Sequence, residues 1–250
     1  MRAEQAPRNL VVSVRGLSKS FGSIDALRNV DLDIYAGELV AMVGDNGAGK
    51  STFAKILSGT IKADSGVLQI GGRQVEFDSP QHALALGIHT VYQDLALVPT
   101  LDVTANLFLG RELTVGPFRF LRSRAMVNRA RSFLKDLEVN VPDVAGRVIA
   151  SMSGGQRQAV AIARAAFWAE RLLILDEPTA ALGVREARAA LSLVRRLRDR
   201  GLAVLMISHV LPHIVGLADR IVVLRHGEKV ADLTGDVSSD RLISLIVGYA

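Results

Sequence analysis

The segment from Gly44 to Ser51, GDNGAGKS, fits the pattern G-x-x-x-x-G-K-[ST]. Its glycines let backbone N–H groups converge on phosphate oxygens, and a helix that starts here adds its positive end. Lys50 can reach the β- and γ-phosphates of a nucleotide, and the hydroxyl of Ser51 can bind Mg²⁺. The pattern therefore predicts a site for nucleotide phosphates with a divalent cation.

Two carboxylates, Asp176 and Glu177, directly follow the apolar run Leu172–Leu175. If this run is a buried strand of an open α/β sheet, Asp176 lies at the carboxyl edge, where ligands of such sheets bind. Asp176 can then hold Mg²⁺, and Glu177 can orient or deprotonate the water that attacks the γ-phosphate. The alternative is a solvated strand end. The phosphate-binding loop earlier in the chain favours the catalytic interpretation.

The segment Ser153–Gln156, SGGQ, precedes the helical run Arg157–Trp168. A hydroxyl and two unhindered backbone amides at a helix N-terminus can bind an anion, although a serine there is usually only a helix cap. Its location between the phosphate-binding loop and the two carboxylates favours a second anion site.

The elements that must position these residues alternate between strands and helices. Runs rich in valine, leucine and isoleucine, suited to strands buried on both faces, lie at Leu39–Val43, Leu172–Leu175, Ala203–Ile207 and Ile221–Leu224. Helical patterns lie between them at Gly49–Leu57, Gly154–Trp168 and Arg185–Arg200. This alternation predicts an α/β fold with a mostly parallel sheet.

Two regions depart from the alternation. Shorter strands at Leu10–Val14, Val30–Ile34, Val67–Ile70 and Val75–Phe77 predict an antiparallel β subdomain. Between Asp94 and Met152, prolines punctuate helical segments such as Val103–Leu109 and Ser123–Leu137, which predicts a helical insertion. An amphipathic pattern at Arg241–Val247 ends the chain. We expect a tail at residues 1–9 and a single domain at 10–250, with a helical subdomain at about 94–152.

Composition narrows the class of protein. The 250 residues include no cysteine, which excludes disulfides, thiolate metal sites and thiol nucleophiles. The N-terminus lacks the apolar core of a secretory signal and no apolar stretch could span a bilayer, so the chain is expected to lie inside the cell. The net charge of +5 is compatible with nucleic acid or an anionic membrane and requires neither. The arginine-rich stretches Arg119–Lys135 and Arg185–Arg200 are expected to be solvated helix faces.

The motifs and their order resemble those of the ATP-binding subunits of ABC transporters, from Leu10 to about Gly248. The resemblance implies a P-loop ATPase in which Phe21 stacks on adenine and Gln93 contacts Mg²⁺ and signals to a membrane partner. It also implies that MSGGQ, ending at Gln156, is the family signature, with methionine in place of the usual leucine. His209 matches the switch histidine that contacts the γ-phosphate.

The expected cofactors are ATP and Mg²⁺. The catalytic residues are expected to be Lys50, Glu177 and His209, and the metal ligands Ser51, Gln93 and Asp176. The residues expected to bind the nucleotide are Phe21, Gly44, Asp45, Asn46, Gly47, Ala48, Gly49, Lys50, Ser51, Thr52, Gln93, Ser153, Gly154, Gly155 and Gln156. The other histidines, His82, His89, His213 and His226, are expected to be structural.

One position departs from the family pattern. Gly183 follows PTAAL, where most of the family has an aspartate that helps to couple two active sites. We expect weaker communication between the sites and intact ATP binding. The segments Ala180–Gly183 and Ile207–His213 resemble those of bacterial import ATPases for ribose, xylose, fructose and related sugars.

The resemblance therefore implies an ATPase that powers sugar import through separate permease subunits, and indirectly a binding protein, at the cytoplasmic face of the cell membrane. Each half-site occurs once, which predicts a homodimer with ATP between Gly44–Thr52 of one copy and Ser153–Gln156 of the other. The alternatives are an ATPase for export or lipid transport and a soluble regulatory ATPase acting on ribosomes or DNA. No nucleic-acid partner is expected. The apolar stretch Leu95–Leu109 either receives a permease helix or packs internally.

Overall fold

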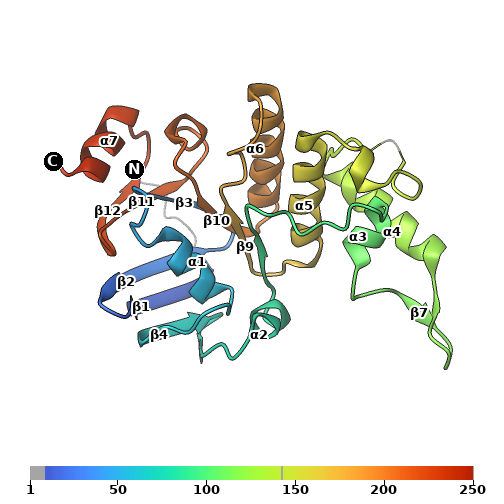
Figure 1. Ribbon diagram of the computed structural model, residues 1–250, viewed down its shortest axis with the longest axis horizontal. Coiled ribbons are helices and arrows are strands. Elements are labelled where there is room, and N and C mark those ends of the chain that lie inside the picture. Colours follow the sequence, from blue (N-terminus) through green and yellow to red (C-terminus); the bar gives the residue numbers. More distant parts are fainter. Residues whose placement is uncertain (1–8, 142, 250) are drawn as a thin grey trace, which may run out of the picture.

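The computed structural model describes residues 9–141 and 143–249, and its larger sheet forms the centre of the molecule (Figure 1). Its six strands run in the order β12-β11-β3-β10-β9-β6. They are β3 (Leu39–Val43), β6 (Ile88–Val91), β9 (Leu172–Asp176), β10 (Ala203–Ile207), β11 (Arg220–Arg225) and β12 (Glu228–Thr234). Every neighbouring pair is parallel except β11 with β12. The predicted mostly parallel sheet is confirmed. Of the predicted tail, only Asn9 lies within the described residues.

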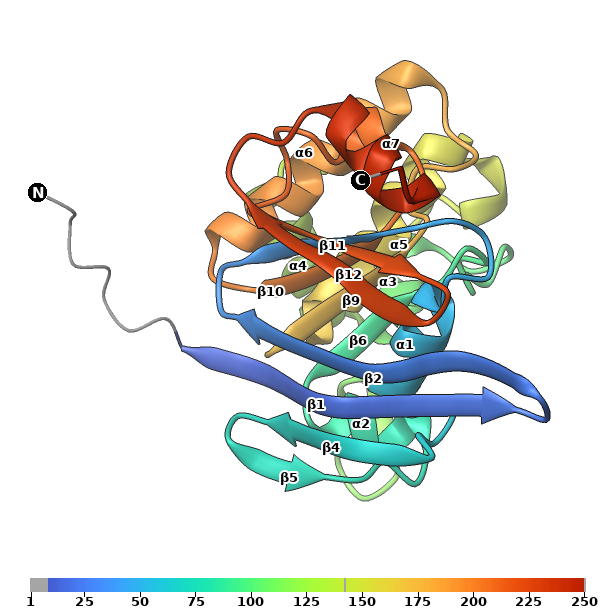
Figure 2. The same ribbon diagram turned by 90° about the vertical axis from the view of Figure 1, so that its left-hand side faces the viewer.

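The smaller sheet is antiparallel and lies beside the larger one (Figure 2). In the order β2-β1-β4-β5, its strands are β1 (Leu10–Phe21), β2 (Ile24–Tyr35), β4 (Ser65–Ile70) and β5 (Arg73–Val75). The predicted bounds Val75–Phe77 for the last strand are wrong. Gly71 and Gly72 have φ of 56° and 77°, so they form a two-residue turn after which pairing resumes at once, at Arg73.

Most of the helices lie in the segments that connect the strands, and they flank the sheets. They are α1 (Lys50–Leu57), α2 (Pro80–Ala85), α3 (Val103–Phe108), α4 (Ser123–Asp136), α5 (Gly154–Trp168), α6 (Val184–Asp199) and α7 (Ser239–Val247). Two short 3₁₀ turns lie at Ile149–Ser151 and Leu211–His213. All the predicted helices form, within two residues of the expected bounds.

The side chains of the central strands divide between two cores, because successive residues of a strand point to opposite faces. On β3, Val40 and Met42 join the core shared with the small sheet and α1. Leu39, Ala41 and Val43 join the core formed with α5, α6 and α7. These five residues are fully buried. The sheet is therefore covered on both faces, and its carboxyl edge is fixed in space.

A third core holds the helical subdomain together. It combines α3 and α4 with one side of α5, and Phe108 and Trp168 meet in it edge to face, with ring centroids 5.8 Å apart. A hairpin of β7 (Thr114–Val115) and β8 (Phe120–Leu121) extends from this subdomain at the end of the molecule opposite α7 (Figure 1). The helical insertion therefore also contains strands, which the sequence pattern did not predict.

The loop between β6 and α3 is fixed by two polar side chains. The fully buried Asn106 amide accepts from Val98 N at 2.8 Å and donates to the carbonyls of Val98, Leu101 and Asp102. Arg164 of α5 donates to the carbonyls of Leu95 and Ala96. Among the apolar side chains of the stretch, those of Val103, Leu107 and Phe108 are buried. Leu95, Leu97, Val98 and Leu101 are only partly buried, and Leu109 is half exposed. Internal packing therefore accounts for the buried residues, and the expectation that the stretch receives a permease helix stays a prediction.

His89 on β6 should make the stability of the fold depend on pH. The residue is 8% exposed, and its Nε2 has no hydrogen-bond partner in the part of the chain that the structure describes. Burial, with repulsion from Arg111 and Arg164, lowers the pKa of His89 from 6.5 to about 4. Between these values the unfolded chain binds a proton that the native state does not, so the free energy of unfolding falls as pH falls. We expect a loss of about 3 kcal/mol from neutral pH to pH 4.

The variant His89→Gln should remove this part of the pH dependence. Urea unfolding at a series of pH values measures it, because carboxylate contributions are common to both proteins. His226→Asn is the control, since His226 is exposed. Parallel pH curves for His89→Gln and the wild type would contradict the assignment.

Candidate functional site

Most of the predicted site residues line one pocket of about 470 Å³ at the carboxyl ends of β3, β9 and β10. Its walls come from both sheets and from the loop before α1. The predicted residues that line it are Phe21, Asn46, Gly47, Ala48, Gly49, Lys50, Ser51, Thr52, Gln93, Asp176, Glu177 and His209. Ile24, Ala26 and Ala180 complete the lining and were not predicted. Side chains from distant parts of the chain therefore meet in one place.

Two glycines allow the loop before α1 to lie close to the sheets. Gly44 has a φ of 151°, and a Cβ there would collide with the carbonyl oxygen of Leu224. Gly49 has a φ of 103°, and its Cβ would collide with the carbonyl oxygen of Ala26. Any larger residue would push the loop away from the sheets and misdirect its N–H groups.

Lys50 is held inside this loop. Its ammonium donates to the carbonyls of Gly44 at 2.7 Å and Asp45 at 2.8 Å, and the residue is 7% exposed. Gly44 and Asp45 themselves do not line the pocket, although both were predicted to bind nucleotide. Burial lowers the pKa of Lys50, and the carboxylates of Glu177, Asp45 and Asp176 partly offset this effect. A phosphate would give this buried cation a stronger partner than two carbonyls.

Asp176 is the last residue of β9, as predicted. Burial raises the pKa of Asp176, and the neighbouring Glu177 carboxylate adds to the rise. The Ser51 hydroxyl and the Lys50 charge act in the opposite direction. Two carboxylates held this close in a partly buried pocket leave negative charge that a cation would stabilise.

Glu177 and His209 contact each other. His209 Nδ1 lies 2.8 Å from Glu177 Oε1, and the backbone N–H of Glu177 donates to the Ile207 carbonyl of β10. Glu177 has a φ of 52°, which is uncommon for a residue with a side chain. Its Oε2 is buried and has no hydrogen-bond partner among residues 9–141 and 143–249. The carboxylate is therefore oriented by one oxygen, while the other oxygen remains available to accept a hydrogen bond.

The predicted aromatic and amide residues lie at the rim of the pocket. Phe21 ends β1 with 51% of its surface exposed, and the Lys19 ammonium lies 5.5 Å from the centre of its ring. Gln93 follows β6 and is also exposed. Both side chains are accessible from solvent.

The Ser153–Gln156 segment lies elsewhere. Ser153 caps α5 and forms a reciprocal pair with Gln156, in which Gln156 N donates to the Ser153 hydroxyl and Ser153 N donates to Gln156 Oε1. Ser153, Gly155 and Gln156 line a second cleft of about 510 Å³ between α5 and α6. No predicted residue lines both cavities, so within one chain the two halves of the expected site are separate.

Sequence reasoning missed Glu186, which joins this cleft to Gly183. A Cβ at Gly155 would lie 2.5 Å from Glu186 Cγ, and a Cβ at Gly183 would lie 2.7 Å from Glu186 Oε2. The Glu186 side chain therefore fills the space beside both glycines. No motif indicated this role. His213, expected to be structural, has its Nδ1 2.9 Å from the buried Thr179 hydroxyl.

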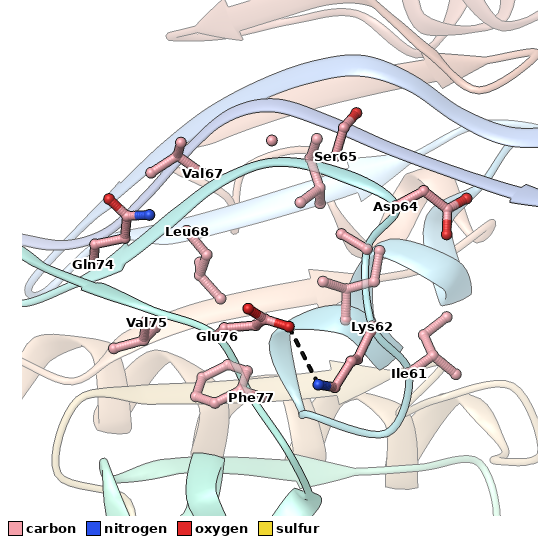
Figure 3. Close-up of a pocket in the computed structure, with 14 residues that line it drawn as sticks. Ile61, Lys62, Asp64, Ser65, Val67, Leu68, Gln74, Val75, Glu76 and Phe77 are labelled. Carbon is pink, nitrogen blue, oxygen red and sulfur yellow. Dashed lines mark hydrogen bonds and ion pairs between the residues drawn. The ribbon is translucent and has the colours of Figure 1, made fainter.

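A further cavity of about 230 Å³ lies beside β4 and β5 (Figure 3). Lys62 pairs with Glu76 at 3.2 Å at its rim, and backbone and apolar side chains form most of its lining. None of the predicted site residues lines this cavity. It is therefore separate from the candidate site.

Comparison with known proteins agrees with this geometry. The sequence profile of the family described as ABC transporter matches residues 27–180, more than half of the chain. The chain belongs to the ABC transporter family. It is an ATP-binding ATPase of that family, and the matched range includes the phosphate-binding loop, the Ser153–Gln156 segment and both carboxylates.

Two relatives match this ABC ATPase over most of their length. The fructose import ATP-binding protein FrcA of Rhizobium meliloti is 44% identical over 224 residues, which cover 88% of this chain and 86% of that protein. The xylose/arabinose import ATP-binding protein XylG of Sulfolobus acidocaldarius is 47% identical over 218 residues, which cover 87% of this chain and 86% of that protein. The two relatives are named for different sugars although their similarity to this chain is nearly equal.

A solved structure gives the same fold for this ABC ATPase. A dimeric ATP-binding cassette, in a post-hydrolysis state bound to ADP and phosphate, superposes with a TM-score of 0.74 at 27% identity. The match covers 89% of this chain and 98% of that cassette. The expected α/β architecture of an ABC ATPase is thereby confirmed.

Proposed function

We propose that this ABC ATPase hydrolyses MgATP to power sugar import through a separate membrane permease. The observation that carries the proposal is the identity of 44% and 47% to two import ATPases over most of their length, both named for sugars. In the described part of the chain, no helix is long and apolar enough to cross a membrane. In the proposed system, partner subunits would form the path for the sugar, and this chain would bind them at the cytoplasmic face.

The pocket is suited to ATP in three regions. The exposed Phe21 ring can stack on the adenine, and the backbone of residues 46–52 can surround the phosphates at the start of α1. Lys50 can exchange its two carbonyl partners for oxygens of the β- and γ-phosphates. The raised pKa of Asp176 reflects a buried charge for which a cation would be the natural partner.

The donor set fits Mg²⁺. The Ser51 hydroxyl, the Gln93 amide and the Asp176 carboxylate line one pocket, and their oxygens are the hard ligands that Mg²⁺ prefers. Residues 9–141 and 143–249 contain no cluster of three His, Cys, Asp or Glu that could hold a metal. Phosphate oxygens and water would complete the coordination, as is common for Mg²⁺ in nucleotide sites. Bound there, the ion would offset charge on the phosphates.

The hydrolytic step would use the two oxygens of Glu177 differently. Oε1 contacts His209, which fixes the plane of the carboxylate, and Oε2 is free to accept a hydrogen bond from the attacking water. That water would attack the γ-phosphorus as the bond to the leaving ADP breaks, and Glu177 would orient the water and accept its proton. His209 is 59% exposed at its side chain, so it can also reach the γ-phosphate.

The separation of the two cavities supports a working dimer. Lys50 and Ser153 belong to different cavities of one chain, so a second copy would have to bring its Ser153–Gln156 segment to the nucleotide. The N-terminus of α5, where Ser153 caps the N–H of Gln156, presents a positive end suited to an anion such as the γ-phosphate. The dimeric cassette noted above, with ADP and phosphate bound, provides a precedent.

Restoring the aspartate at position 183 should not by itself strengthen communication between the sites. The new side chain would meet Glu186 Oε2 and place two carboxylates side by side, at a cost of about 1 kcal/mol. We expect Gly183→Asp to lower ATPase activity about fivefold by displacing Glu186 from Gly155. In the double variant Gly183→Asp with Glu186→Gln, the two side chains at these positions no longer repel each other. The Hill coefficient for ATP hydrolysis should then rise above that of the wild type. Higher cooperativity in Gly183→Asp alone would contradict this account.

Sugar uptake tests the proposed function directly. In a strain that lacks the gene, uptake of one radiolabelled pentose or hexose should be lost and should return with the wild-type gene. The matched control is Glu177→Gln, which should be produced normally and fail to restore uptake. Normal uptake of every sugar, together with loss of lipid or drug export, would refute sugar import and favour an export ATPase.

A further inference from the structure

The β7–β8 hairpin exposes apolar side chains that no other part of the described chain covers. Val115 is 55% exposed, Phe118 80% and Phe120 66%. Val115 and Phe120 are directly paired across the hairpin, so they share one face. The rings of Phe118 and Phe120 lie 6.1 Å apart. These three residues form one continuous apolar tip.

Basic residues flank this tip in the sequence, and the first of them, Arg111, stacks on Trp168 of the helical subdomain. The segment from Arg111 to Arg124 contains four arginines and one glutamate, which leaves a charge of +3. Arg119, Arg122 and Arg124 are exposed, and none of them has a carboxylate within ion-pair distance in the described part of the chain. The one acid, Glu112, accepts from the N–H of Gly110 in its own loop, at 2.9 Å, and also interacts with the charge of Arg119. The tip therefore combines apolar side chains with nearby arginines, of which Arg122 and Arg124 have no ion-pair partner among the described residues.

The backbone of the hairpin presents these residues outward. Gly116 and Arg119 bound the turn with φ of 73° and 53°, and Arg119 N donates to the Gly116 carbonyl. Arg122 N donates to the Leu113 carbonyl at the base of the hairpin. Figure 1 shows the hairpin projecting beyond α4, at the opposite end of the long axis from α7. It is therefore formed in the free protein and directed into solvent.

We propose that this hairpin binds the surface of a membrane that contains anionic phospholipid. Aromatic side chains are favoured at the boundary between head groups and acyl chains, and arginine forms paired hydrogen bonds with phosphate. A stable protein interface needs about 800 Å² from each partner, far more than a tip of two two-residue strands offers. A bilayer sets no such requirement, because a few inserted side chains and nearby charges suffice for reversible binding.

Co-sedimentation of the purified full chain with lipid vesicles tests the proposal. Without nucleotide, the protein should bind vesicles of phosphatidylcholine mixed with phosphatidylglycerol and should not bind phosphatidylcholine vesicles. In Phe118→Ser with Phe120→Ser, binding should weaken on the order of tenfold or more. Each of Arg119→Ser, Arg122→Ser and Arg124→Ser should weaken binding about fivefold and reduce its sensitivity to salt.

Matched controls separate vesicle binding by the hairpin from nonspecific binding by other exposed apolar residues and from ATPase activity. Ile243 and Tyr249, 50% and 87% exposed near α7, carry apolar surface at the far end of the molecule, so Ile243→Ser with Tyr249→Ser should bind vesicles normally. All these variants should hydrolyse ATP in solution like the wild type, because the hairpin does not line the nucleotide pocket. Failure of the ATPase assignment would therefore leave the vesicle result unaffected.

Two results would overturn the proposal. One is the absence of binding to anionic vesicles, or binding that the hairpin substitutions leave unchanged. The other is capture by proteoliposomes that contain the permease when protein-free vesicles of the same lipid do not bind. That result would assign the hairpin to a protein partner.

Discussion

Glu177→Gln should slow ATP hydrolysis at least about a hundredfold while ATP still binds. Glutamine keeps the size of the side chain and cannot accept a proton from the attacking water. The phosphate-binding loop and Lys50 are untouched, so affinity for ATP should change little. Single-turnover hydrolysis and equilibrium binding of a fluorescent ATP analogue measure the two effects separately.

The same variant should accumulate as an ATP-bound dimer, because the nucleotide that joins the two copies is no longer removed. Sedimentation velocity with and without MgATP tests this expectation. Glu170→Gln, at an exposed position, is the matched control and should behave like the wild type. Undiminished turnover in Glu177→Gln, or a monomer at saturating MgATP, would be incompatible with the proposed roles.

Lys50→Ala should abolish measurable turnover and weaken ATP binding about a hundredfold. The substitution removes a charged hydrogen-bond donor that is worth about 3 kcal/mol when it meets a phosphate. Isothermal titration with ATP and a steady-state ATPase assay give both quantities.

Lys55→Ala provides the control for the lysine substitution. Lys55 lies on the same helix, is exposed and does not line the pocket, so its loss should leave affinity and turnover unchanged. If Lys50→Ala bound ATP as tightly as Lys55→Ala does, Lys50 could not be a phosphate ligand.

The sequence predicted the parts of the fold in which one physical signal dominates. β3, β9 and β10 are continuous apolar runs because both faces of the sheet are covered. β6 was missed because only four residues, which include His89 and Thr90, form it at the edge of the parallel array. β12 was missed because its residues are largely polar and partly exposed on the outer edge. Such strands depend on pairing with a neighbour, which a local pattern does not encode.

In the candidate site, too, some residues could be predicted from the sequence and others could not. Its motif residues were predictable because phosphate chemistry restricts both their types and their spacing. Glu186 was not, because its proximity to Gly155 arises from the way α5 packs on α6. The contact between His209 and Glu177 likewise depends on β9 and β10 being neighbours in the sheet. Contacts between distant segments follow from the tertiary structure.

The two hydrogen bonds from Arg164 to the carbonyls of Leu95 and Ala96 have a mechanical consequence. These carbonyls lie two and three residues beyond Gln93. If Gln93 moves toward a bound nucleotide, the hydrogen bonds should transmit the movement to Arg164 and so to α5. Arg164 is eleven residues from Ser153, about 16 Å along the axis of a stiff rod. In the proposed dimer, we expect that filling one pocket moves α5 as a rigid rod, so that its Ser153 end shifts toward the nucleotide of the second copy.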